Sequence, residues 1–308
     1  MPPLLRLLRF PNLAAVALTQ ALVVYWILRP AFAAAGLTAR LSDWKVAELI
    51  GVTALVTASG YMINDLFDAP GDELNRPGTN MIVKLGKDLV GWLYGSMVLG
   101  GYLISLLLAF RLDELEWLWL YPVAVGLLAA YSPYLKKVPL LGNVLVAVYC
   151  AGVVGIVVLA ERDTLGQLAV MDPALYRNVV RVLLLYSVLA FGATLLREIV
   201  KDLQDLSGDL VLGRRTLPIE VGGKFTKAVC YLIGSTLLLS LAWPFLRGWQ
   251  FFLGGFLPWL FGLMLVAVFA LLVGLQRAKE AAAYGRISTG LKFVLFGGVL
   301  LLFLFGLK

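Results

Sequence analysis

DLFDAPGD, residues Asp65–Asp72, returns later in the chain as DLQDLSGD, residues Asp202–Asp209. Five of the eight positions are identical, and in both copies the aspartates stand at positions i, i+3 and i+7. This spacing places them on one face of a helix, and each copy follows a long apolar run. Two carboxylate clusters at the ends of apolar helices need cations, and clustered oxygen ligands favour Mg²⁺, which usually holds a diphosphate in turn. The repeat therefore predicts a metal–diphosphate site at a membrane surface.

The composition is that of a polytopic membrane protein. Hydrophobic residues make up 61% of the 308 residues and charged residues only 15%, and the mean hydropathy is +0.89. We expect an all-α fold in which residues 1–308 form a single transmembrane domain, with no separate soluble domain. The chain contains no histidine, which excludes histidine general bases, Ser-His-Asp triads and haem ligation by histidine. Any chemistry therefore has to come from carboxylates, cations, tyrosines and metal.

Apolar runs long enough to cross a bilayer recur about nine times. The first run follows Arg6 and Arg9 in the manner of a signal peptide, but it is too long for one, so we expect a retained helix. The expected spans are residues 13–35, 46–66, 88–110, 116–132, 139–160, 178–198, 226–246, 252–275 and 288–307.

Both acidic motifs are expected to face the cytoplasm. Most of the 26 Lys and Arg residues fall on the side of the membrane that holds both motifs, and cytoplasmic loops carry the excess of positive charge. The copies lie four spans apart, an even number, so the halves, roughly 1–135 and 136–308, could be related by a twofold axis along the membrane normal. Anionic lipid and an anionic substrate explain the net charge of +7 without nucleic acid.

A third polar cluster, YSPYLKKVPLLGN at residues Tyr131–Asn143, lies between the motifs and at the same face of the membrane. Its lysines would place cations beside the carboxylates, as a diphosphate site requires. Two simpler interpretations stay open. Lys136 and Lys137 are also typical of topology signals, and Tyr131 and Tyr134 are also typical of the aromatic belt at a membrane interface.

At these residues the chain resembles the UbiA-type intramembrane prenyltransferases. NDLFDAPGDELNRP, residues Asn64–Pro77, is similar to their first aspartate-rich motif, NDxxDxxxDxxNRP, and REIVKDLQDLSGD followed by GRRTLP is similar to their second. The stretch YSPYLKKVPLLGN and the RFPN entry into the first span are similar as well. Four ordered matches on one side of about nine spans are far more specific than a single DxxD.

The resemblance implies a bundle of about nine helices around a central cavity, capped by cytoplasmic loops and open sideways to lipid. It implies an enzyme that moves a prenyl group from a prenyl diphosphate to a lipophilic acceptor, with two Mg²⁺ ions bridging the diphosphate to the aspartates. Whether Asp65 and Glu198 also bind metal stays open. By motif position, the implied metal-site residues are Asn64, Asp68, Asp72, Asp202, Asp205 and Asp209.

Cations and tyrosines are expected around the diphosphate. Ionisation of an allylic diphosphate builds negative charge on the leaving group, which metal and fixed cations stabilise where water cannot screen them. Tyr131 and Tyr134 offer an electron-rich wall for the allylic cation. The expected cationic clamp is Arg76, Lys84, Lys136, Lys201 and Arg215, and the expected substrate-binding residues are Arg9, Asn12, Tyr134, Lys137 and Arg197.

Two features depart from the family pattern. Where the family often has RPIPSG, this chain has Arg76-Pro77 followed by GTNMIVKLG, so Lys84 takes the place of a second arginine. Pro70 and Gly71 interrupt the first motif, and a proline inside a helix costs about 3 kcal/mol. We therefore expect the second helix to end near Asp68 and to leave Asp72 on a loop.

The acceptor is harder to predict than the donor. Within the family, Arg197-Glu198-Ile199 with Lys201-Asp202 and the later TLP most resembles the members that transfer geranylgeranyl to geranylgeranylglyceryl phosphate in ether-lipid synthesis. The alternative within the family is an aromatic acceptor of quinone biosynthesis. An alternative of another class is a cation-coupled transporter, although its acids are expected near the membrane midplane and these lie at helix ends.

Overall fold

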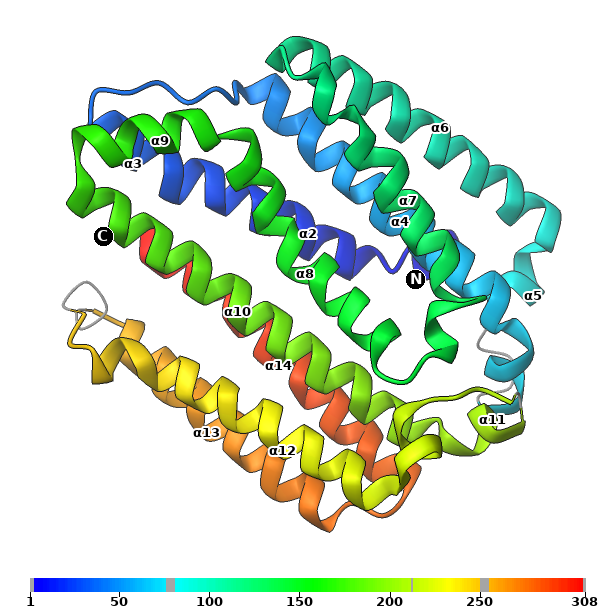
Figure 1. Ribbon diagram of the computed structural model, residues 1–308. Coiled ribbons are helices and arrows are strands. Elements are labelled where there is room, and N and C mark those ends of the chain that lie inside the picture. Colours follow the sequence, from blue (N-terminus) through cyan, green and yellow to red (C-terminus); the bar gives the residue numbers. More distant parts are fainter. Residues whose placement is uncertain (1–2, 76–80, 212, 250–254, 307–308) are drawn as a thin grey trace.

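The computed structural model describes residues 3–75, 81–211, 213–249 and 255–306, and this part of the chain is helical and contains no strand (Figure 1). Eight helical segments within it are long and apolar enough to cross a membrane. A further, shorter apolar segment covers Leu115–Tyr131. The predicted all-α bundle of about nine spans is confirmed.

The first span is interrupted where the sequence requires it. It consists of α2 (Phe10–Leu22), a π-helical segment (Val23–Leu28) and α3 (Arg29–Ala34). Pro30 has no N–H to continue the α-helical hydrogen bonds, and the Arg29 N–H bonds instead to Val24 O, five residues back. The other spans are α4 (Asp43–Asn75), α6 (Lys87–Leu112), the 3-10 helix Leu115–Trp119 with α7 (Leu120–Tyr131), α8 (Leu141–Ala160), α10 (Pro173–Gln204), α12 (Leu217–Leu246), α13 (Leu257–Arg277) and α14 (Ala281–Gly306). The short helices are α1 (Pro3–Leu7), α5 (Met81–Leu85), the 3-10 helix Leu135–Lys137, α9 (Arg162–Met171) and α11 (Leu206–Val211).

The helix α10 lies at the centre of the bundle (Figure 1). It packs against α8, α12 and α14. In its most apolar stretch 61% of the residues are buried, compared with 11% in α6, which lies at the edge of the bundle (Figure 1). Because the second acidic motif begins on the last turn of α10, packing on several sides fixes where its aspartates lie.

The helix α4 is longer than the sequence indicated. The prediction that it ends near Asp68 is wrong, because the helix continues through Pro70 and Gly71 to Asn75. Proline removes only one hydrogen bond, to the carbonyl of Leu66, and near a helix end that carbonyl can bond to water instead. Asp72 therefore belongs to the helix and not to a loop, while its side chain lies outside the described part of the structure.

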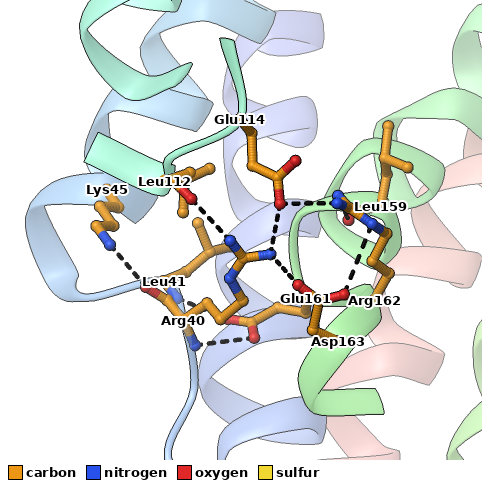
Figure 2. A network of polar contacts seen from close by, with 9 residues as sticks. All are labelled: Arg40, Leu41, Lys45, Leu112, Glu114, Leu159, Glu161, Arg162 and Asp163. Atoms are coloured by element: carbon orange, nitrogen blue, oxygen red, sulfur yellow. Dashed lines mark hydrogen bonds and ion pairs between the residues drawn. The ribbon is translucent and has the colours of Figure 1, made fainter. Parts of the chain in front are cut away.

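Charged side chains join the loops at the end of the bundle opposite the acidic motifs (Figure 2). Arg40, which precedes α4, and Arg162, at the start of α9, both donate hydrogen bonds to Glu114. These hydrogen bonds, the one from Arg162 above all, hold the pKa of Glu114 below its usual value. Glu161 is fully buried and accepts from the backbone N–H groups of Arg40 and Leu41. These contacts join the loops at this end of the bundle, whereas the aspartates of both motifs lie at the other end.

Candidate functional site

The first acidic motif lies on the last turns of α4 and faces cations from two other segments. Asp68 is buried, and its two carboxylate oxygens accept hydrogen bonds from Lys136 Nζ, at 2.6 Å, and from Arg214 Nη2. Asn64, one turn earlier on α4, accepts a hydrogen bond from Ser132 Oγ at 3.1 Å. The segment between α7 and α8 and the turn after α11 thus both reach the first motif.

The second acidic motif comes to the same place from α10 and α11. Asp202 lies on the last turn of α10 and accepts a hydrogen bond from Asn143 Nδ2 at 2.8 Å. Asp205 follows directly at the C-terminal end of α10. Asp209, on α11, is 2% exposed and accepts from Arg214 Nη1 at 2.8 Å. Arg214 therefore bonds one aspartate of each motif and links the two copies directly.

Burial makes these carboxylates dependent on nearby cations. Removal from water raises the pKa of Asp209, and the hydrogen bond and charge of Arg214 oppose that rise. A buried carboxylate that keeps its charge needs a close partner, and for Asp68 the partners are Lys136 and Arg214. Lys136 and Arg214 therefore stabilise the charged forms of these carboxylates.

Arg214, and not the predicted Arg215, lies beside the aspartates of the site. Arg215 is exposed and pairs with Glu220 on α12, whereas Arg214 faces the aspartates. Gly213, immediately before the pair, has a φ of 62° and turns the chain at this point. Residue type and spacing do not distinguish two adjacent arginines, so no signal in the sequence identified Arg214. Asn143 belongs to the third polar cluster, and this membership is the signal in the sequence that it lies near the aspartates.

The other predicted cations lie in several places, and not all of them are in the site. Lys136 lies in the site, as described above. Lys201 pairs with Glu198 on its own helix at 3.1 Å. Lys84 is exposed on α5. Arg76 lies outside the described residues.

The two predicted tyrosines differ in position. Tyr131 ends α7, is partly buried and lies within electrostatic range of Asp68 and Asp202. Tyr134 is 70% exposed, and Lys137 is exposed as well. Of these residues, Tyr131 is the one placed to line the site.

The predicted substrate-binding residues at the start of the first span lie beside α4. Arg9 donates a hydrogen bond to Asp65 at 2.7 Å, and its guanidinium lies 4.6 Å from the centroid of the Tyr61 ring. Asn12 donates to the Tyr61 hydroxyl at 3.1 Å. Arg197, on α10, donates to Glu198 at 2.6 Å.

The ligand atoms at the site suit a hard cation. Carboxylate and amide oxygens, as in Asn64, Asp68, Asp202 and Asp209, are the ligands that Mg²⁺ prefers. Within the described residues, no three acidic or cysteine side chains are arranged to enclose a metal ion by themselves. Mg²⁺ commonly takes one or two carboxylates and completes its shell with water and substrate phosphates. The arrangement therefore fits a metal that binds together with a diphosphate.

A family profile and two named relatives match most of this chain. The profile of the UbiA prenyltransferase family matches residues 21–290. A digeranylgeranylglyceryl phosphate synthase of Sulfurisphaera tokodaii is 28% identical over 83% of this chain and 87% of its own length. One of Natronomonas pharaonis is 34% identical over 71% of each chain.

Solved structures share the fold. A structure of digeranylgeranylglyceryl phosphate synthase superposes with a TM-score of 0.67 and 19% identity, covering 99% of this chain and 98% of the other. A UbiA homologue from Archaeoglobus fulgidus, bound to GPP and Mg²⁺, gives a TM-score of 0.52 and 15% identity over 98% of this chain and 99% of the other.

Proposed function

Because this chain belongs to the UbiA prenyltransferase family and is a prenyltransferase, we propose that it transfers a geranylgeranyl group from geranylgeranyl diphosphate to geranylgeranylglyceryl phosphate. The observation that carries the proposal is the meeting of the two acidic motifs, with Lys136 and Arg214 between them. The names of the relatives from S. tokodaii and N. pharaonis support this acceptor over an aromatic one. Family membership also disfavours a transporter.

The chain's own residues bind and orient the diphosphate. Asn64, Asp68, Asp202 and Asp209 are the residues that would hold the metal, with two Mg²⁺ ions per site. When bound, Mg²⁺ supplies positive charge that stabilises the departing diphosphate. Lys136 and Arg214, which donate hydrogen bonds to Asp68, would also donate to phosphate oxygens of the bound donor.

The transfer itself exchanges one C–O bond for another. The bond between C1 of the prenyl chain and the diphosphate oxygen breaks, and its electron pair leaves with pyrophosphate. A lone pair of the acceptor hydroxyl forms the new ether bond to C1, and the hydroxyl proton passes to an oxygen of pyrophosphate. Tyr131 presents an aromatic ring to the allylic cation. The surrounding helices exclude water, which would otherwise convert the donor to a free alcohol.

In this proposal the acidic motifs face the cytoplasm, and the network around Glu114 faces the opposite side of the membrane. The excess of Lys and Arg on the motif side supports this orientation. The relation of the halves 1–135 and 136–308 by a twofold axis stays a prediction.

A product assay tests the proposal. Purified protein in lipid nanodiscs receives Mg²⁺ and labelled geranylgeranyl diphosphate, with either geranylgeranylglyceryl phosphate or a panel of aromatic acids as acceptor. Mass spectrometry should find the diether product with the glycerol phosphate and no prenylated aromatic acid. Products formed only from aromatic acceptors would reject the proposed acceptor while leaving the prenyltransferase class intact.

A further inference from the structure

A second set of charges lies about one helix turn deeper in the bundle than the aspartates of the site. On α4, Asp65 precedes Asp68 by three residues and binds Arg9 at 2.7 Å. On α10, Glu198 precedes Asp202 by four residues and binds two cations. Three to four residues make one helical turn of about 5.4 Å. Glu198 also lies within electrostatic range of Arg9, so the two sides form one polar region.

The helix α14 adds a lysine at the same depth. Gly285 of α14 packs against Gln204 of α10, since a Cβ at Gly285 would lie 3.2 Å from Gln204 Nε2. The two helices run in opposite directions, and Lys292 and Arg197 each lie seven residues, or about two turns, further into the bundle on those same faces. The groups within electrostatic range of Lys292 agree with this register, and they are Arg197, Lys201, Arg9 and Glu198.

Positive charge is in excess at this depth. The inner cation layer consists of Arg9, Arg197, Lys201 and Lys292. Asp65 and Glu198 pair with three of these cations, and Asp202, the residue after Lys201, lies within electrostatic range of Lys201, so four formal positive charges face three negative ones. Within the described residues Lys292 forms no ion pair, and Arg197 Nε is buried without a hydrogen-bond partner. Uncompensated charge inside a membrane protein is costly and marks a binding site.

The layer is open to a ligand. The side chains of Arg9 and Lys201 are 40% and 31% exposed, and Lys292 is exposed although it lies in the middle of a span. A phosphate monoester carries a charge of about −1.5 to −2 near pH 7 and has three acceptor oxygens, so it can accept hydrogen bonds from several of these cations at once.

We infer that the inner cation layer binds the phosphate of the acceptor, and that Lys292 makes the enzyme select a phosphorylated acceptor. This inference rests on the proposed function. In geranylgeranylglyceryl phosphate the reacting hydroxyl and the phosphate stand on neighbouring carbons, so the phosphate lies within a few ångströms of the reacting C1. A layer one turn from the metal-binding aspartates satisfies that geometry. It also keeps the acceptor phosphate apart from the donor diphosphate beside Lys136 and Arg214.

Steady-state kinetics with two acceptors test the role of Lys292. Lys292→Met removes the charge at nearly the same length, Lys292→Arg retains it, and Arg286→Gln removes an exposed charge from the same helix as a control. Lys292→Met should raise the KM for geranylgeranylglyceryl phosphate about 10- to 100-fold, the effect of losing one charge-assisted hydrogen bond. The donor KM, and transfer to geranylgeranylglycerol without phosphate, should hardly change. Lys292→Arg and Arg286→Gln should behave like the wild type.

The outcomes separate the two proposals. An unchanged acceptor KM in Lys292→Met, or a raised donor KM instead, would overturn the inference. No transfer by the wild type to the phosphorylated acceptor would reject the proposed function itself. Binding without metal gives a second test: with EDTA present, inorganic phosphate should raise the melting temperature of the wild type more than that of Lys292→Met, because Lys136 and Arg214 are the same in both. An equal shift in the two proteins, or no shift across millimolar phosphate, would count against the layer.

Discussion

Replacing Arg214 with alanine should break the direct link between the two acidic motifs. The Arg214 side chain is 15% exposed, and its partners Asp68 and Asp209 are 9% and 3% exposed. Removing one partner of a buried ion pair costs about 3–5 kcal/mol, because the other charge stays buried and unpaired. We therefore expect Arg214→Ala to lower the free energy of unfolding of the ligand-free protein by that amount.

The same substitution should slow the reaction. A fixed donor that stabilises developing negative charge contributes about 2.7–4 kcal/mol, which corresponds to about 10²- to 10³-fold in kcat. Arg215→Ala is the matched control, because Arg215 is 67% exposed and pairs with Glu220 instead. Exposed ion pairs contribute little, so this variant should stay within about threefold of the wild-type kcat.

Both variants can be measured in nanodiscs, as initial rates of product formation and as thermal unfolding. Mg²⁺ with an inert thiodiphosphate analogue of the donor should restore part of the stability that Arg214→Ala loses, because ligand charge replaces the guanidinium. Wild-type activity in Arg214→Ala, or an equal loss in Arg215→Ala, would show that bridging the two motifs does not serve the reaction.

Three further predictions address the metal ligands, the topology and the opposite end of the bundle. Asp68→Asn and Asp202→Asn should each abolish transfer while the protein stays folded, because an amide of the same size replaces a charged metal ligand. Substantial activity in both variants would argue against a site shared by the two motifs. Cysteines introduced at Lys84 and at the exposed Leu115, next to Glu114, should react with an impermeant reagent from opposite sides of the membrane, the first from the cytoplasm, and labelling from one side would contradict the proposed topology. Glu114→Gln should lower the melting temperature at pH 7. Because the folded-state pKa of Glu114 is lowered from 4.5, its contribution is complete above that pH and is lost as the pH falls through the folded-state value. The difference from the wild type should therefore shrink in acid, and a constant difference would contradict an ionic role.

The membrane class, the number of spans and the family follow from the order of residues alone. Span length is set by bilayer thickness and the rise of a helix per residue, and the aspartate spacing is set by the helical period. All three are local properties, so the chain could be divided into spans and its acidic faces located without knowledge of packing. The end of α4 was less predictable, because a proline near a helix terminus lowers helix stability without deciding where the helix stops.

The tertiary structure decided which side chains from different helices contact one another. Arg214 and Arg215 are neighbours of the same type, yet only the approach of the turn after α11 to α4 places the first beside Asp68. Likewise, Lys292 carries no motif, and its depth beside Arg197 follows from the packing of Gly285 against Gln204. Local rules decide which residues share a face of one helix, whereas the relative shift of two helices depends on side chains far apart in the sequence. The sequence by itself determined that two acidic motifs lie at helix ends on one side of a membrane; the packing of the helices decided which cations face them.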